Sequence, residues 1–125
     1  MEIVRDAFAA FERGDVTKLL DLMADDLVTH RIDPDNAVYH GKEGFFEATA
    51  EWTEDFEDWT VTPEEFFDVS DGVVVRVRQT ARGRTSGVPV ESLMWFGLRI
   101  DGGRIAQLTF HSDEAQAFEA AELSE

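Results

Sequence analysis

The sequence predicts an α+β fold, with most helices in the first half of the chain and an antiparallel sheet in the second. Apolar residues recur at helical spacing up to about residue 56, and the pattern then changes to the alternation of strands. Turns that contain glycine separate the later strands, as is typical of hairpins. Helices followed by a run of strands indicate α+β rather than alternating β–α–β units. The length of 125 residues predicts a single domain, 1–125.

The first half is expected to form three helices and one short strand. The first helix ends at Gly14, because glycine readily adopts the left-handed conformation that closes a helix. Asp15 then caps the second helix through its side chain. The expected elements are helices at 3–13, 16–23 and 42–56, a strand at 27–32 and a loop at 33–41.

The second half is expected to form four strands in a meander and a short final helix. Ser70-Asp71-Gly72 forms the first hairpin turn, and Gly102-Gly103 forms the last. The final two strands are expected at 90–101 and 104–111. Asp113 is placed to cap a closing helix at 114–122. On the middle strands, Glu91 is in position to pair with an arginine across the sheet.

The charge and composition exclude several classes of function. The formal charge is −16, from 27 acidic against 11 basic residues, which disfavours nucleic acid and anionic membrane surfaces as partners. The chain has no cysteine, so thiolate chemistry and cysteine-based metal sites are excluded. The N-terminal stretch is a charged helix rather than a signal peptide, and no apolar run is long enough to span a membrane. We therefore expect a cytoplasmic protein.

Several stretches, taken in order, are similar to one known superfamily. In AFERGDVTKLLDLMADDLVTH, two helices are joined by Gly-Asp, and paired acids lead into a strand. YHGKE precedes the third helix, SGVPV precedes a late strand, and DGGRI turns into the last strand. Together with the tail at 113–123, these stretches resemble the SnoaL-like branch of the nuclear-transport-factor-2-like superfamily.

This resemblance implies a cone-shaped barrel. A strongly curved, mixed but mostly antiparallel sheet would wrap around the three N-terminal helices, with a short C-terminal helix at the end. The resemblance also implies an apolar pocket inside the cone and a homodimer formed through the outer face of the sheet. Because the superfamily contains isomerases, dehydratases, cyclases and non-enzymatic binding domains, the fold alone does not decide the function.

His111 is the first candidate for a catalytic residue. In related tails a tyrosine at the matching position faces the cone, and an imidazole there could act as general acid or base. His30, on the first strand, could join it across the cavity, and Asp113 could orient it. The alternative is a structural role for each: His111 would be bonded near the helix cap, and His30 would be a surface residue on a short strand. Strand alternation groups one set of residues on the face of His111: Ile105, Gln107, Thr109 and His111.

Large aromatic residues are the candidates for a ligand-binding lining, with plain core packing as the alternative. Trp95 and Phe96 have opposite parity, so at most one of them faces inward, and a bulge near Gly97 would exchange them. No cofactor is expected. A metal site built from His30, His40 and an Asp is not supported by ligand spacing. The candidate ligand-binding residues are Phe11, Trp52, Phe56 and Trp95.

Two functions remain open from the sequence. The first is a cofactor-free enzyme that performs cyclisation, isomerisation or dehydration on a small apolar carbonyl compound by acid–base chemistry. The second is a non-catalytic domain whose cone holds a small apolar ligand. A third, docking onto a partner protein through the sheet, competes with the dimer for the same face.

Overall fold

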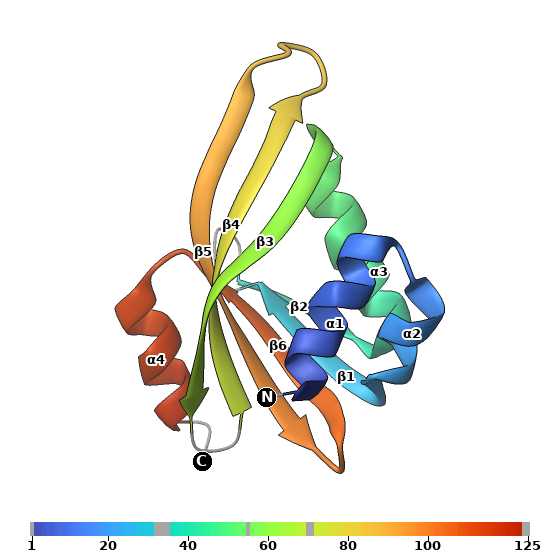
Figure 1. The fold of residues 1–125 in the computed structure, drawn as a ribbon, viewed down its shortest axis with the longest axis vertical. Helices are drawn as coiled ribbons and strands as arrows, with labels where there is room; N and C mark the ends of the chain where they lie inside the picture. Colours follow the sequence, from blue (N-terminus) through green and yellow to red (C-terminus); the bar gives the residue numbers. More distant parts are fainter. Residues whose placement is uncertain (1, 32–35, 55, 70–71, 124–125) are drawn as a thin grey trace.

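A computed structural model describes residues 2–31, 36–54, 56–69 and 72–123 as one six-stranded sheet and four helices (Figure 1). The helices are α1 (Glu2–Arg13), α2 (Val16–Asp21), α3 (Gly41–Thr53) and α4 (Glu114–Leu123). The strands are β1 (Met23–Arg31), β2 (Ala37–His40), β3 (Phe56–Val69), β4 (Gly72–Gly83), β5 (Pro89–Asp101) and β6 (Arg104–His111).

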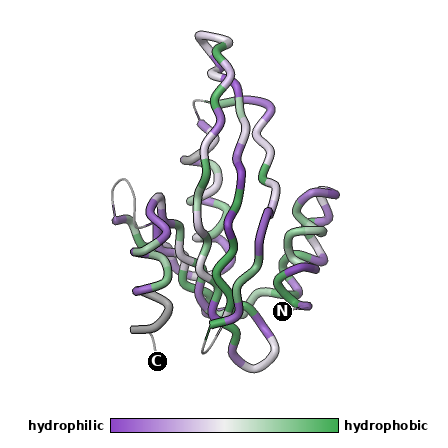
Figure 2. The backbone as a smooth tube through the Cα atoms, turned by 60° about the vertical axis from the view of Figure 1, so that its left-hand side comes forward, coloured by the Kyte–Doolittle hydropathy of each residue, from purple (hydrophilic) through white to green (hydrophobic). Residues whose placement is uncertain are grey.

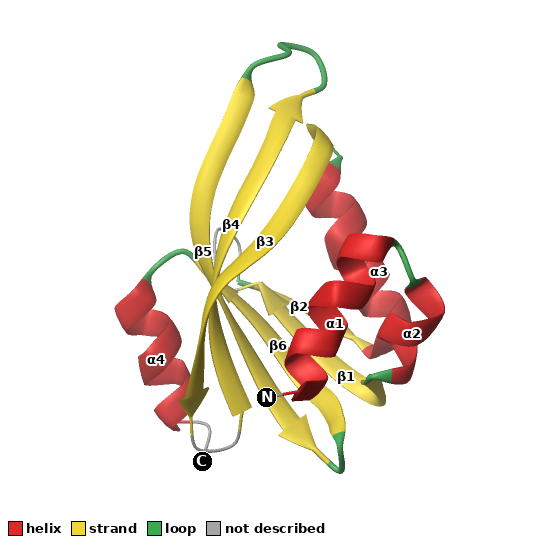
Figure 3. Ribbon diagram, in the orientation of Figure 1, coloured by secondary structure: helices red, strands yellow, loops and turns green. Residues whose placement is uncertain are grey.

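The sheet is mixed but mostly antiparallel, as predicted. Its strand order is β2-β1-β6-β5-β4-β3, and β1 and β6 form the parallel pair. The remaining neighbours pair antiparallel. The strands curve strongly, and the sheet stays open, with β2 and β3 at its edges (Figure 3). The predicted α+β class and curved cone are therefore confirmed.

The helices divide between the two faces of the sheet. Helices α1, α2 and α3 lie on one face, called the inner face below, whereas α4 packs on the opposite, outer face (Figures 1 and 2). On the outer face, the Phe118 ring of α4 contacts the Phe67 ring of β3 at a centroid distance of 5.2 Å. This contact places α4 over one end of β3–β5 and leaves the long hairpin end of these strands beyond it.

Local sequence signals explain how the first helices begin and end. Gly14 has a φ of 72°, the left-handed conformation expected after α1. The carboxylate of Asp15 accepts a hydrogen bond from the Lys18 amide at 3.2 Å, which confirms the predicted cap of α2. Val4, Ala7 and Ala10 form the buried stripe of α1.

Two elements differ from the sequence prediction. Residues 37–40, expected in a loop, form β2 because they pair antiparallel with β1, from Val28 opposite His40 to Arg31 opposite Ala37. The third helix, expected to continue to residue 56, ends at Thr53, and Phe56 instead begins β3 opposite Gly83. In both cases the element is decided by pairing with another strand, which the periodicity within the segment itself does not reveal.

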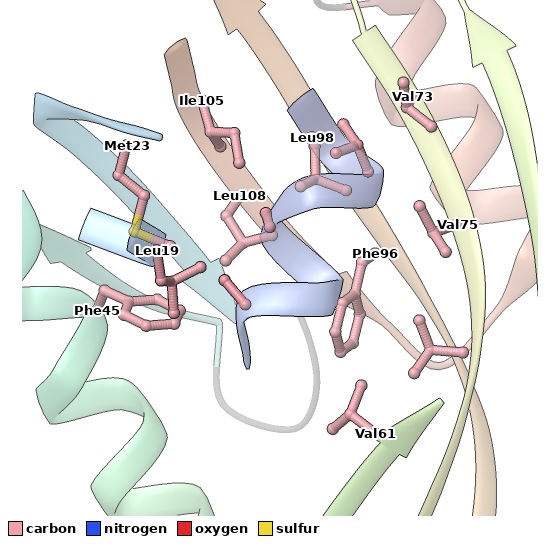
Figure 4. Packing of buried hydrophobic residues seen from close by; sticks show 14 of the residues in the cluster. Leu19, Met23, Phe45, Val61, Val73, Val75, Phe96, Leu98, Ile105 and Leu108 are labelled. Atoms are coloured by element: carbon pink, nitrogen blue, oxygen red, sulfur yellow. The ribbon is translucent and has the colours of Figure 1, made fainter. Parts of the chain in front are cut away.

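The core lies between the inner face and α1–α3. Its side chains converge on α1 from the sheet and from the other two helices, as Leu19, Phe45, Phe96 and Leu108 show (Figure 4). On β4, Val73, Val75 and Val77 point to this core, whereas Val74 is fully buried on the outer face, where α4 packs. None of the helices in the described part of the chain is long and apolar enough to cross a membrane.

Candidate functional site

A cavity lies between the inner face of the sheet and α1–α3. Its volume is about 80 Å³. One water molecule takes up roughly 10–15 Å³ of such a cavity volume, so the cavity has room for a small organic molecule or several waters. The helices contribute Ala7, Phe8, Phe11, Leu19, Phe45, Ala48 and Thr49 to its wall. The strands contribute Met23, Arg31, Trp59, Val61, Gln79, Met94, Phe96, Leu98, Ile105, Leu108 and Phe110.

Nearly all of this wall is apolar, and three of the described lining residues have polar side chains: Arg31, Thr49 and Gln79. The Thr49 hydroxyl donates to the Phe45 carbonyl at 2.9 Å within α3, so it is committed to its own helix. Arg31 and Gln79 lie on β1 and β4, which are separated by two other strands. At roughly 4.8 Å per strand, the two residues occupy separate parts of the wall.

Gln79 is held in place by aromatic and sulfur partners. Its Oε1 accepts a hydrogen bond from the Trp59 indole at 2.9 Å, and its Nε2 contacts the Met94 sulfur. All three residues line the cavity. Because Gln79 is 5% exposed, this pairing satisfies a polar group inside an otherwise apolar wall.

Arg31 is the charged residue of the described lining. It is 8% exposed, and its Nη2 donates to the Tyr39 hydroxyl at 3.1 Å. That hydroxyl donates in turn to the Glu51 carboxylate. The chain of contacts joins β1, β2 and α3, so three elements determine where the guanidinium lies.

His111 lies on the outer face of the sheet rather than in the cavity. It is 1% exposed, and its Nε2 is 3.0 Å from the Thr109 hydroxyl, which donates to the Gly97 carbonyl at 3.4 Å. The residues of β6 that reach the cavity are Ile105, Leu108 and Phe110. The catalytic role assigned to His111 stays a prediction, and the inward orientation on which it depended is wrong.

His111 faces outward because β6 contains a bulge. Ile105 pairs with Ile100 and Gln107 pairs with the preceding Arg99, so Ala106 is an extra residue in β6. Unbroken alternation groups Ile105 with His111. With the extra residue, Ile105 shares the inner face with Leu108 instead.

The other two predicted catalytic residues are also away from the cavity wall that the structure describes. His30 shares the outer face with Val28, and its Nε2 lies 2.6 Å from the Asn36 side-chain oxygen. Asp113 caps α4 by accepting the Gln116 amide at 3.1 Å. Their catalytic roles stay predictions, whereas the predicted helix cap at Asp113 is confirmed.

The predicted lining residues divide in a similar way. Phe11 lines the cavity. Phe96 does so in place of Trp95, which shares the outer face with its cross-strand neighbours Arg76 and His111. Phe56 belongs to β3 and does not contribute to the described wall, and the side chain of Trp52 lies outside the described residues.

Arg31 and Gln79 were missed by the sequence analysis, although a signal for each was present. By strand alternation, Arg31 lies on the same face of β1 as the buried Leu27. Gln79 likewise lies on the same face of β4 as the buried Val73, Val75 and Val77. A polar residue at a buried position of a strand needs a partner or a ligand, and this argument would have selected both.

The outer face also carries an ion-pair network near the uncovered ends of β3–β5. Arg78 donates to Glu64 at 2.8 Å and contacts Glu91, and Arg76 lies 3.4 Å from Glu64. The hydrogen bond from Arg78 holds the pKa of the Glu64 carboxyl below its usual value. The arginine predicted to pair with Glu91 across the sheet is thus Arg78.

Across residues 2–31, 36–54, 56–69 and 72–123, no three His, Asp or Glu side chains gather as a metal site would require.

Comparison with solved structures shows the same fold in bacterial proteins. One is a nuclear-transport-factor-2-like protein of unknown function from Burkholderia pseudomallei, 20% identical over 97% of this chain and 95% of that one, with a TM-score of 0.78. A second, from Catenulispora acidiphila, has a ketosteroid isomerase-like fold and was crystallised with trimethylamine. It is 21% identical over 97% and 92% of the two chains, with a TM-score of 0.75.

A third neighbour is a candidate polyketide cyclase from Sinorhizobium meliloti, 24% identical over 89% of this chain and 94% of that one, with a TM-score of 0.70. A search of curated proteins gave no match. The family model for the SnoaL-like domain matches residues 4–108, which include all of the described lining residues except Phe110. The chain therefore belongs to the SnoaL-like domain family.

Proposed function

We propose that this protein binds a small, predominantly apolar molecule in the cavity between the inner face and α1–α3. The observation that carries the proposal is the wall itself, which is apolar apart from Arg31, Thr49 and Gln79. Binding sites for small molecules are typically apolar hollows with a few polar groups that orient the ligand. A ligand that displaces water from such a wall gains the free energy of apolar burial.

Family relationships support a small-molecule partner. The chain belongs to the SnoaL-like family, and structural neighbours include a candidate polyketide cyclase and a protein crystallised with trimethylamine. The size of the cavity favours a ligand of about one aromatic ring. Binding is better supported than cofactor-free acid–base catalysis, because the described lining contains no carboxylate or imidazole that could move a proton.

The binding proposal is tested by filling the cavity from α3. Ala48 is 2% exposed and lines the cavity, whereas Ala50 is exposed on the same helix. Ala48→Leu adds bulk inside the cavity, and Ala50→Leu is the matched control with the same chemical change. Toluene serves as the neutral probe, and its binding is followed by NMR at the Trp59 indole N–H, whose side chain belongs to the wall.

We expect toluene to shift the Trp59 signal in the wild type and in Ala50→Leu, and to bind at least about tenfold more weakly to Ala48→Leu. A tenfold loss corresponds to about 1.4 kcal/mol, which a partly filled cavity readily produces. Equal affinity of the two variants, or no shift at Trp59 in the wild type, would refute the proposal.

We also propose that the protein forms a homodimer through the outer face of β3–β5. Leu93, which is 38% exposed, lies on this face beside the Arg78–Glu91 ion pair. An isologous contact would bring each such patch against its copy, where charges of both signs can pair. Sedimentation at micromolar concentration should give a dimer for the wild type and a monomer for Leu93→Arg. A wild-type monomer contradicts the proposal.

A further inference from the structure

We propose that the cavity is selective for hydrocarbons: it encloses a neutral ring or alkyl group and rejects a ligand that brings a hydroxyl, a carbonyl or a charge inside. This inference rests on the proposed binding function and narrows its ligand class. The starting observation is that the described wall presents an almost entirely apolar surface to the cavity, although three polar residues contribute to it.

Two of these residues direct their polar atoms away from the cavity. The Arg31 guanidinium donates to the Tyr39 hydroxyl at 3.1 Å, so the aliphatic stem of Arg31 is the part that borders the cavity. The Thr49 hydroxyl donates to the Phe45 carbonyl within α3, which leaves the Thr49 methyl group as its apolar surface. At both positions the ligand would meet carbon atoms.

The third polar residue, Gln79, is held by neighbours that also line the cavity. Its Oε1 accepts from the Trp59 indole at 2.9 Å, and its Nε2 contacts the Met94 sulfur. Within the described wall, no buried side-chain nitrogen or oxygen is left without a hydrogen-bond partner. Most binding sites place a few polar groups to orient the ligand, whereas here those groups are already engaged within the protein.

Aromatic rings keep the wall in this arrangement. Phe96 lies between Phe8, at a ring-centroid distance of 6.1 Å, and Phe110, at 4.8 Å. Phe11 meets the Trp59 ring edge to face at 5.4 Å. All five rings line the cavity, and a ring that enters it can make the same stacked and edge-to-face contacts.

A polar group on the ligand would lose its bonds to water and find no replacement in such a wall. An unpaired hydroxyl or carbonyl is costly to bury, and an unpaired charge is more costly still. The carbonyl compound that the sequence led us to expect as a substrate would carry this penalty if its carbonyl entered the cavity. The selectivity therefore comes from the cost of burying polar atoms rather than from a recognition contact.

The test compares toluene with phenol, which have nearly the same shape and differ by a methyl group against a hydroxyl. Both affinities are measured by NMR at the Trp59 indole N–H. We expect the wild type to prefer toluene by about ten- to hundredfold, the range in which an apolar pocket rejects an isostere that carries a hydroxyl. A preference below about tenfold overturns the inference.

A single added hydroxyl in the wall should reduce this preference. Val61 is 5% exposed and lines the cavity, so Val61→Thr places a hydroxyl there with little change in shape. Its oxygen can accept a hydrogen bond from phenol whichever partner takes its own proton. Val90, which is 42% exposed on β5 and outside the described wall, provides the matched control Val90→Thr.

In Val61→Thr we expect the preference for toluene to fall by at least about threefold, as for one neutral hydrogen bond, while Val90→Thr behaves as the wild type. An unchanged preference in Val61→Thr, or an equal fall in Val90→Thr, overturns the inference. If Val61→Thr does not fold, Met23→Gln replaces it, because Met23 also lines the cavity and glutamine has a similar shape.

The outcomes also separate this inference from the binding proposal. Binding of toluene and phenol with similar affinity rejects the hydrocarbon selectivity and leaves the cavity as a binding site. Failure of toluene to bind, with no difference between Ala48→Leu and Ala50→Leu, rejects the binding site and with it the selectivity.

Discussion

Two leucine-to-alanine substitutions should differ in their effect on stability, because one leucine borders the cavity and the other does not. Leu27, on β1, is fully buried in the core and does not line the cavity. Leu108, on β6, is 6% exposed and lines the cavity. The two positions therefore carry the same chemical change in two packing environments.

The expected magnitudes follow from these environments. Replacing a buried leucine by alanine costs about 2–5 kcal/mol, and the value depends on how many contacts are lost and on the space left behind. Leu27 is surrounded by packed atoms, so we expect a loss of about 4–5 kcal/mol. Leu108 already faces open space on one side and has fewer contacts to lose, so we expect about 2–3 kcal/mol.

Equilibrium urea unfolding, followed by circular dichroism, measures both values. At a slope of about 1.5 kcal/mol per molar urea, the two variants should differ in midpoint by roughly 1 M. All samples need the same protein concentration, because a dimer makes the apparent stability depend on it. If Leu27→Ala has no folded baseline, Leu27→Val and Leu108→Val form a milder pair with the same expected order.

Equal losses at the two positions would refute the reasoning. They would mean that Leu108 is packed as tightly as Leu27 and that the cavity is closed in solution. A larger loss at Leu108 would contradict the structure more strongly. The expected order, in contrast, would establish the open space by a measurement that needs no ligand.

Three further outcomes are expected. Gln79→Leu leaves the Trp59 indole without its acceptor and should lower the free energy of unfolding by about 1–3 kcal/mol in the same urea assay. An unchanged free energy of unfolding in this variant would contradict the hydrogen bond between Gln79 and Trp59. Arg78 lowers the pKa of Glu64 in the folded state, so the ionised Glu64 side chain stabilises the fold. This stabilisation is present above the unfolded-state pKa near 4.5 and is lost as the pH falls through the folded-state pKa. Glu64→Gln should therefore be less stable than the wild type at neutral pH and match it in acid, whereas a constant gap would exclude the ion pair. His111→Gln should lower stability but leave toluene affinity unchanged, because His111 is buried on the outer face, and a tenfold weaker affinity would place it at the site.

The features that were predictable from the sequence are those that depend on neighbouring residues. Gly14 ends α1 and Asp15 caps α2 through contacts within a few residues. On β4, Val73, Val75 and Val77 alternate along the sequence and share the buried face. These elements follow from backbone preferences and side-chain periodicity, which act over one or two turns of chain.

The features that were missed depend on pairing with another strand. The edge strand β2 exists because 37–40 pair with β1, and Phe56 leaves the helical pattern because it pairs with Gly83. The free energy that stabilises a strand comes from the neighbour across the ladder, and no local pattern carries that information.

By itself, the sequence determined the α+β class, the order of most elements and the apolar content that a cone must enclose. Only the tertiary structure decided which side chains reach the cavity. Alternation along a strand says which residues share a face, but not which face is inside, and the extra residue Ala106 reverses the grouping within β6. For that reason His111 is buried on the outer face, and the residues of β6 that line the cavity are Ile105, Leu108 and Phe110.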